Sequence, residues 1–246
     1  MVDLTIILPT KNSEKNIKFF LDSLKIQDYQ NFFLFVADSE SKDNTIEIIK
    51  SYNFNLKIIS QKDRNAEEGI NNCLKEITTK YFGILMSDDV LGEKNYISQL
   101  IYTLKNGADI ALPNSGNIIN NKFLKNDQNN EFEKLTYHNV SPDIGWFARK
   151  NVINEGLFTE KYKLATAYHF LLRLYKKKYI LKRNKNIYYY FRVGGNSFEN
   201  AILAYYEQTK ISKQFGANKF LVYTIFITNF FKYVIKYKLL KFYFKV

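Results

Sequence analysis

Short apolar runs alternate with helix-period segments over residues 1–115, and this alternation limits the possible folds more than any other feature of the chain. Between the runs, apolar side chains recur at i, i+3, i+4 and i+7, which predicts amphipathic helices, the first of them capped by Ser13. The chain is therefore predicted to have an α/β fold, in which helices flank a mixed, mostly parallel sheet. The five runs end in polar residues, as strands buried on both faces of a parallel sheet do, and they are 4–10, 32–38, 56–60, 81–89 and 108–114.

Composition fits a globular protein with a sizeable core, because the chain has 246 residues and is 46% apolar. Cys73 is the single cysteine, which excludes an internal disulfide and a zinc site of clustered Cys and His. The N-terminus runs directly into the first apolar segment and shows no signal-peptide pattern. These features predict a reducing, cytoplasmic setting.

Polar residues follow four of the predicted strands, where an open parallel sheet binds its ligands. The sequence has no Gly-rich dinucleotide motif and no P-loop, so a phosphate-bearing ligand needs another source of positive charge. The adjacent carboxylates of Asp88 and Asp89 suit Mg²⁺ or Mn²⁺ bridging a diphosphate, and a solvated turn or helix cap is the alternative. The four strand ends read Pro9-Thr10-Lys11-Asn12, Asp38-Ser39, Gln61-Lys62-Asp63-Arg64 and Ser87-Asp88-Asp89.

The order of these segments resembles the family 2 glycosyltransferases of the GT-A fold. The matching runs include PTKNSEKNIKFFLDSL, VADSESKDNTIEII, DRNAEEGINNCLKEITTKYFGILMSDD and FRVGGNS. The similarity covers roughly the first 200 residues in the family's order, which is far more specific than any one motif. The resemblance implies an inverting transfer of a sugar from a nucleotide diphosphate sugar, usually UDP-linked, to an acceptor hydroxyl.

The resemblance also implies roles for individual residues. Asp38 would lie near the base and ribose, Asp88 by the ribose, and Asp89 would bind the Mn²⁺ or Mg²⁺ that stabilises the leaving diphosphate. Arg64 and the backbone of 193–196 would assist at the phosphates, with a surface salt bridge and a plain turn as the alternatives. The residues expected at the base are Pro9, Thr10, Lys11 and Asp63.

Several positions depart from the family pattern near the expected donor site. Lys11 replaces a common Tyr, Glu40 replaces a Gly, and Asn65 with Glu67-Glu68 replaces a GIYD segment. These changes bear on which donor is bound. Asn71 keeps the family's Asn, and it is expected to order a loop rather than to touch substrate.

Position 167 departs from the family at the place of the catalytic base. The family commonly has an Asp six residues ahead of the Arg that corresponds to Arg173, and this chain has Ala167 there. A base that takes the acceptor proton contributes about 10²- to 10⁴-fold. The surrounding run, 161–192, holds ten Lys and Arg and no acid. Three explanations stay open: a deliberate Asp-to-Ala change, a protein that binds nucleotide sugar without turnover, or His169 acting as the base.

Two residues are candidates on the acceptor side. Trp146, the only tryptophan, precedes a predicted helix and is interpreted as either a platform for a sugar or part of the core. Asp143 is interpreted as either an alternative acid or a cap. Residues 115–140 are rich in Asn and are expected to form a loop.

The C-terminal segment carries most of the positive charge. Residues 161–246 hold 18 Lys and Arg against 2 acids, and their last part, 216–246, interleaves lysines with aromatic residues. The apolar stretch of 220–231 is shorter than the roughly 20 residues of a transmembrane helix. We therefore expect a transferase domain over 1–215 and an amphipathic helical tail over 216–246 that lies on an anionic membrane. A helix packed on its own domain or at an oligomer contact is the alternative, and nucleic acid is the less favoured partner.

The sequence thus predicts an inverting, metal-dependent glycosyltransferase at the inner face of the cell membrane. Its donor would be a nucleotide sugar, and its acceptor a lipid-linked oligosaccharide or a polysaccharide. The alternative function is a non-catalytic scaffold that binds nucleotide sugar within a glycan assembly complex.

Overall fold

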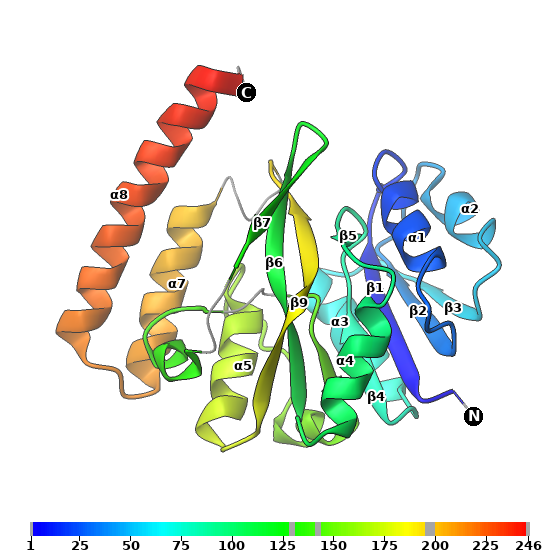
Figure 1. Cartoon of the computed structure of the whole chain (residues 1–246), viewed down its shortest axis with the longest axis horizontal. Helices are drawn as coiled ribbons and strands as arrows, with labels where there is room; N and C mark the ends of the chain where they lie inside the picture. The colour runs from blue at the N-terminus through cyan, green and yellow to red at the C-terminus, as the bar shows by residue number, and fades with distance from the viewer. Residues whose placement is uncertain (1, 128–130, 141–143, 195–199, 245–246) are drawn as a thin grey trace.

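A single mixed sheet with helices on both faces forms the body of the protein (Figure 1). The computed structural model describes residues 2–127, 131–140, 144–194 and 200–244. The strands lie side by side in the order β3-β2-β1-β4-β8-β6-β9-β5, and β7 pairs with β6. The structure therefore confirms the predicted α/β architecture.

The N-terminal half of the sheet is parallel, and three of its four strands begin and end where the apolar runs predict. Three of the five predicted runs coincide with strands along their whole length. The fourth run leaves the sheet early, at Ile84, so that 85–89 form a loop beyond the strand end. The parallel strands are β1 (Leu4–Thr10), β2 (Phe32–Asp38), β3 (Leu56–Ser60) and β4 (Tyr81–Ile84).

The other half of the sheet mixes directions and contains the longest strands. β8 (Phe147–Arg149) is antiparallel to both β4 and β6, and it joins the two halves. β6 (Ile110–Ile119) extends beyond the predicted run and pairs with β9 (Leu181–Arg192) in parallel. Part of the expected loop is a strand, because β7 (Lys122–Asn126) forms a hairpin with β6. At the edge of the sheet, the short strand β5 (Val90–Leu91) pairs with β9.

Helices cover the two faces of the sheet in two separate hydrophobic clusters. One cluster contains α1 (Ile17–Lys25), part of α2 (Thr45–Lys50) and α4 (Tyr96–Lys105). The other contains α3 (Ala66–Glu76), α5 (Thr166–Lys176) and the short 3₁₀ helices η1 (Phe132–Thr136) and η2 (Lys150–Glu155). α1, α3 and α4 bury the apolar faces that their periodicity predicts.

The expected cap of the first helix is wrong in detail. α1 begins at Ile17, one turn after Ser13, and the carbonyl of Ser13 accepts the amide of Ile17 at 2.8 Å. The Ser13 hydroxyl instead bonds to side chains at the strand ends, as described below. A polar turn therefore separates β1 from α1.

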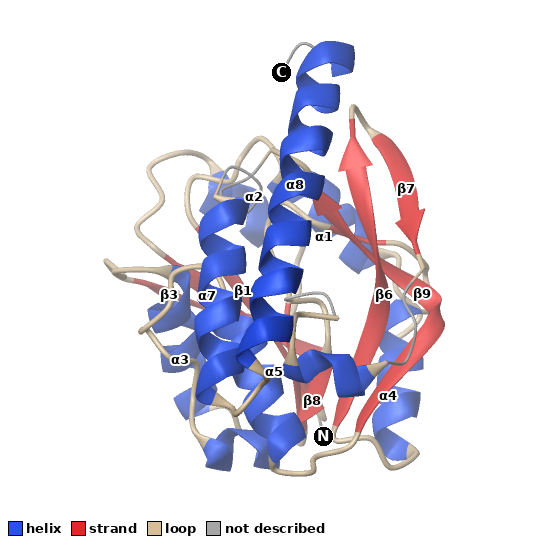
Figure 2. Ribbon diagram, turned by 90° about the vertical axis from the view of Figure 1, so that its left-hand side faces the viewer, coloured by secondary structure: helices blue, strands red, loops and turns tan. Residues whose placement is uncertain are grey.

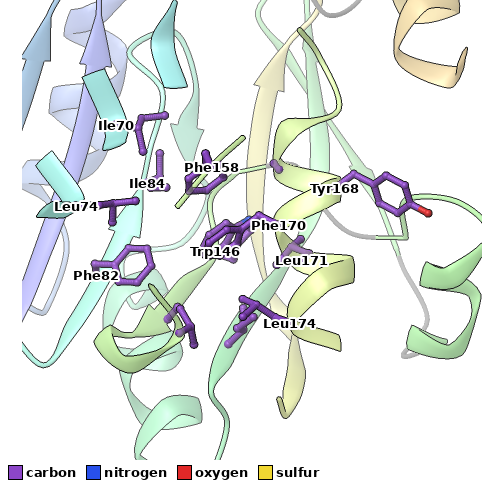
Figure 3. Close-up of a cluster of buried hydrophobic side chains, with 14 of the residues drawn as sticks. Ile70, Leu74, Phe82, Ile84, Trp146, Phe158, Tyr168, Phe170, Leu171 and Leu174 are labelled. Atoms are coloured by element: carbon purple, nitrogen blue, oxygen red, sulfur yellow. The ribbon is translucent and has the colours of Figure 1, made fainter. Parts of the chain in front are cut away.

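The second cluster corrects the expectation for Trp146 (Figure 3). Its indole is 0% exposed and stacks on Phe170, whose ring in turn stacks on Phe158. A side chain without exposed surface cannot stack on a sugar, so Trp146 belongs to the core. It also precedes strand β8 rather than the predicted helix, because the following residues pair with β4 and β6.

The chain ends in two packed helices beside the sheet (Figure 2). α7 (Ala201–Gln214) lies against α5, and α8 (Lys219–Phe244) packs against α7 through the buried Val222. In Figure 2 the far end of α8 projects beyond the rest of the molecule. No helix in the described ranges is long and apolar enough to cross a membrane.

Candidate functional site

The carboxyl ends of β1, β2 and β3 meet at one edge of the sheet, at Asp38. Parallel pairing sets Thr10 beside Asp38 and Asp38 beside Ser60. The Asp38 carboxylate is nearly buried and accepts the hydroxyls of Ser41 and Ser60, both at 2.6 Å. The structure thus brings this predicted donor residue to the strand edge and fixes its orientation by hydrogen bonds.

A chain of hydroxyls links this edge to the loop after β4. The Thr10 hydroxyl donates to Ser13 at 3.0 Å, and the Ser13 hydroxyl lies 2.8 Å from that of Ser87. Pro9 is buried within β1, whereas Lys11 is exposed just beyond it. The predicted base-contacting turn and the Asp88-Asp89 segment are therefore held together.

Asp63 lies against the first turns of α3, because Gly69 leaves room for it. A Cβ atom built on Gly69 would lie 2.7 Å from Oδ2 of Asp63 and 3.2 Å from Cβ of Ala37. The other carboxylate oxygen accepts the Gln61 amide at 2.8 Å. Asp63 therefore sits next to the strand end that carries Asp38.

The departures from the family pattern after Asp63 form a helix cap. Oδ1 of Asn65 accepts the amide of Glu68 at 2.9 Å, and the Glu68 carboxylate accepts the amide of Arg64 at 2.7 Å. This resembles a capping box, which satisfies amides at a helix N-terminus. The Arg64 guanidinium, which is largely exposed, forms ion pairs with Glu68 and Glu160, each at 2.9 Å. Arg64 thus forms the surface salt bridges that were the alternative to a role at the phosphates.

Asp89 is buried beyond β4, and Asp88 beside it is partly buried. Asp89 is 4% exposed, and Oδ1 of Asp89 accepts the amide of Arg192 at 3.2 Å. Burial raises the pKa of Asp88, and burial together with the neighbouring Asp88 raises the pKa of Asp89 well above its usual range. A nearby cation would favour the charged form of both groups.

The pair fits a divalent cation by the chemistry of its donors. Within the described ranges no group of three or more His, Cys, Asp and Glu could hold a metal ion. Mg²⁺, however, is commonly held by one or two carboxylates together with substrate phosphates and water, so a larger protein cage is not needed. Hard carboxylate oxygens are also the ligand type that Mn²⁺ prefers.

Arg192 is a candidate that the sequence analysis missed. Its Nε donates to the carbonyl oxygen of Asp88 at 3.3 Å, so its guanidinium lies beside the carboxylate pair. The signal was its place just before the Val193-Gly194 turn, in which Gly194 has a φ of 106°. Positions 195 and 196 of that turn, and Asp143, lie outside the described residues.

Two acids from distant helices reach the acid-free segment at α5. The Glu207 carboxylate accepts the backbone amides of Lys163, Leu164 and Ala165 at 2.9–3.1 Å. Oε1 of Glu67 accepts the Thr166 hydroxyl at 2.9 Å. The gap is visible in the sequence, but the acids that reach it lie 99 and 42 positions from the residues that they bind.

His169 lies in an environment that disfavours a role as base. Its ring lies between those of Tyr162 and Phe215, with centroids 5.7 and 5.6 Å away, and its buried Nδ1 has no hydrogen-bond partner in the described part of the chain. Burial, aided by Arg173 and Lys161, lowers the pKa of His169 to about 4. Such an imidazole is neutral but weakly basic.

Asn71 orders a loop, as predicted. Its amide donates to the carbonyl of Phe158 at 2.9 Å and its oxygen accepts the amide of Phe158 at 3.0 Å. The pair is buried and ties α3 to the segment that leads into α5. These two hydrogen bonds engage both the amide nitrogen and the oxygen of the Asn71 side chain.

The described side chains of α8 include large apolar groups that are exposed, and Lys219 and Lys232 are exposed on the same helix. Four of its exposed residues repeat every four positions and therefore form one stripe along the helix: Tyr223, Ile227, Phe231 and Ile235. On another side of α8, Leu221 and Ile225 line a groove of about 570 Å³ shared with η1 and its flanks, including Lys134 and His138.

A profile of the family described as Glycosyl transferase family 2 matches residues 5–198. The chain is 26% identical over 147 residues to the UDP-Glc:alpha-D-GlcNAc-diphosphoundecaprenol beta-1,3-glucosyltransferase WfgD of Escherichia coli, covering 58% of this chain and 56% of that protein. It thus spans about half the length of WfgD.

A second relative is matched over more of the chain. It is the dolichyl N-acetyl-alpha-D-glucosaminyl phosphate 3-beta-D-2,3-diacetamido-2,3-dideoxy-beta-D-glucuronosyltransferase of Methanococcus voltae. The identity is 26% over 233 residues, which cover 82% of this chain and 71% of the relative.

Solved structures share the fold at low identity. Staphylococcus aureus TarS 1-349 in complex with UDP-GlcNAc matches with a TM-score of 0.67 and 19% identity, covering 85% of this chain and 66% of TarS 1-349. The mannosyltransferase PcManGT from Pyrobaculum calidifontis, in complex with GDP-Man and Mn²⁺, matches with a TM-score of 0.68 and 14% identity, covering 88% of this chain and 65% of that one. The fold is that of the GT-A glycosyltransferases, as expected.

Proposed function

The chain belongs to glycosyl transferase family 2, and on this premise we propose that it transfers a sugar, with inversion, from a UDP-linked donor to a hydroxyl of a lipid-linked or polysaccharide acceptor. The observation that carries the proposal is the meeting of four strand ends at one edge of the sheet. That edge holds Thr10, Asp38, Asp63 and the Asp88-Asp89 pair. Ligands of open α/β sheets bind at such an edge.

The donor residues divide into two groups by their surroundings. Asp38 and Asp63 lie beside the β2 end as hydrogen-bond acceptors, which suits the N–H and hydroxyl groups of a base and ribose. Thr10 and the exposed Lys11 border the same place. Arg64 reaches a phosphate only by exchanging its exposed ion pairs for it, which costs little at the surface.

Asp89, with Asp88 beside it, would hold Mn²⁺ or Mg²⁺. Bound there, the cation would act as a Lewis acid that stabilises the charge on the leaving nucleoside diphosphate. Arg192, anchored to the Asp88 carbonyl, adds a fixed positive charge to the same region. The cation and Arg192 would thus neutralise the diphosphate, which a P-loop does in other nucleotide-binding proteins.

The acceptor side is assigned to the α8 surface. A stripe of exposed aromatic and aliphatic side chains next to lysines suits the interface of an anionic bilayer. The groove between η1 and α8 combines apolar walls with the Glu131–Lys134 ion pair, and its apolar part suits the first part of a lipid anchor. We place the protein at the inner face of the cell membrane, with 1–215 as the transferase domain and 216–246 as the membrane-contacting tail.

The second candidate function is a scaffold that binds nucleotide sugar without transfer. The observation that favours it is Ala167, whose methyl side chain cannot accept a proton at the position of the family's base. Binding and transfer are separable by measurement. The test is calorimetric titration with UDP and Mn²⁺, followed by a transfer assay with UDP-sugars on diphosphoundecaprenol-linked GlcNAc. Binding together with transfer supports the enzyme, and binding alone supports the scaffold. If the protein shows neither binding nor transfer, both functions are refuted.

A further inference from the structure

A carboxylate from α3 lies beside the position where the family has its acid. Glu67 is the second residue of α3, and its Oε1 accepts the Thr166 hydroxyl at 2.9 Å. Thr166 is 5% exposed and directly precedes Ala167 at the start of α5. A carboxylate on another helix therefore binds the residue that directly precedes position 167.

The same turns of α3 also contact the candidate donor site. Gly69, two residues after Glu67, packs within 2.7 Å of Asp63 and 3.2 Å of Ala37, measured from a Cβ built on the glycine. Ala37 directly precedes Asp38. Glu67 thus lies on a rigid element between the donor carboxylates and the α5 terminus, where an acceptor hydroxyl has to approach.

The neighbouring acids are already committed to other partners. Glu207 accepts three backbone amides at the start of α5, and Glu68 is bound by Arg64. Glu67 makes a single side-chain hydrogen bond, through Oε1, within the described part of the chain. Its Oε2 therefore remains able to accept a proton from a substrate.

We propose that Glu67 is the general base of the transfer, in place of an acid at position 167. The proposal rests on the proposed function. The acceptor oxygen forms a bond to the anomeric carbon while the bond from that carbon to the diphosphate oxygen breaks. The diphosphate leaves with the electron pair, and the acceptor proton passes to Oε2 of Glu67 and then to water. Thr166 is a positioning residue, because it orients the carboxylate through Oε1.

The test is Glu67→Gln in the full chain. Gln keeps an oxygen that accepts the Thr166 hydroxyl but cannot take a proton, so the fold and UDP affinity should be unchanged. We expect kcat to fall about 10²- to 10⁴-fold, the contribution of a general base. The acidic part of the pH profile of kcat should also change, which a merely structural role would not cause.

Three further variants complete the experiment. Glu76→Gln is the matched control, because Glu76 is an exposed acid on the same helix, paired with Lys57, and it should keep wild-type activity. Thr166→Val should lower kcat less than Glu67→Gln and shift the pH profile without changing KM for the donor. Adding Ala167→Asp to Glu67→Gln should restore part of the lost kcat.

The outcomes separate the two proposals. Glu67→Gln with at least a third of wild-type kcat and an unchanged pH profile overturns the role of Glu67 and leaves the proposed function standing. Wild-type protein that binds UDP but transfers sugar only after Ala167→Asp also overturns it. If the wild-type protein neither binds UDP nor transfers sugar, the proposed function is refuted, and the proposed role of Glu67 is refuted with it.

Discussion

The side-chain carboxylate of Glu207, on α7, accepts the backbone amide of Ala165, the N-cap residue of α5, at 3.1 Å. The two residues are 42 positions apart in sequence. α5 has no side-chain cap of its own, and Glu207 also accepts the amides of Lys163 and Leu164. A buried anion from another helix thus satisfies the amides that precede α5, in the place of a local cap.

Replacing Glu207 by Gln should destabilise the protein. The variant keeps the shape but loses the charge of a carboxylate bound to three amides, which we expect to cost about 1–3 kcal/mol of unfolding free energy. Urea unfolding followed by circular dichroism measures it. Glu133→Gln, at an exposed acid of η1, is the control and should change stability by less than about 0.5 kcal/mol. Equal stabilities of the two variants would contradict the capping role.

Replacing Gly69 by Ala should weaken nucleotide binding without loosening the fold. The added Cβ would meet the Asp63 carboxylate at 2.7 Å, where the flexible side chain can turn away, and Cβ of Ala37 at 3.2 Å, where a shift of a few tenths of an ångström suffices. Ala is also the better helix former by about 1 kcal/mol. We expect a melting temperature close to wild type and UDP affinity lower by about tenfold, the equivalent of one hydrogen bond. Asn72→Ala, on the same helix, should leave UDP affinity unchanged; a matching loss there would point to helix distortion.

Sequence patterns predicted the parallel half of the fold because local periodicity determines it. The runs that became β1 and β2 are buried on both faces or nearly so, and each reads as a nearly continuous apolar sequence, whereas β3 is only partly buried. Parallel pairing then brings the polar residues after these strands to one edge of the sheet, and the resemblance to the family supplied the expected roles of Thr10, Asp38 and Asp89.

The rest depends on contacts between distant segments, which periodicity does not record. Glu67 and Glu207 reach α5 through tertiary packing across 99 and 42 positions, so the acid-free run looked empty. Trp146 was ambiguous for a similar reason. Only the packing of α5 shows that its indole stacks on Phe170 in the core.

Replacing His169 by Leu should make the protein less sensitive to acid. The pKa of His169 is lowered to about 4 in the folded protein, and it is about 6.5 in an unfolded chain. Between these values the unfolded state binds the extra proton, so the wild type loses stability as pH falls from 6.5 towards 4. Urea unfolding at pH 7.5 and 5.0 should show a smaller loss for His169→Leu. An equal loss in wild type and variant would mean that His169 titrates normally.

Replacing Asp89 by Asn should remove the metal dependence of nucleotide binding. Amide oxygen is a weaker, uncharged ligand for a hard divalent cation, so we expect Mn²⁺ to strengthen UDP binding in the wild type but not in the variant. The loss in the presence of Mn²⁺ should be about 10- to 100-fold. Calorimetric titration of UDP with and without Mn²⁺ measures it, and Asp28→Asn, at an exposed acid bonded to Ser98, is the control. Metal-independent UDP binding by the wild type would contradict the role of Asp89.

Removing aromatic side chains from the α8 stripe should release the protein from anionic vesicles. Tyr223 and Phe231 are exposed on one face of α8, and burying a large apolar side chain contributes about 1.5–3 kcal/mol. We therefore expect Tyr223→Ser with Phe231→Ser to lower co-sedimentation with phosphatidylglycerol vesicles at least tenfold. The control pair is Ile26→Ser with Tyr102→Ser, at exposed apolar residues elsewhere on the chain, which should bind as the wild type does. Because lysines contribute to the attraction, binding should also weaken with added salt. If both pairs bind equally, the stripe does not face the membrane, and packing against another protein copy becomes the better explanation of its exposure.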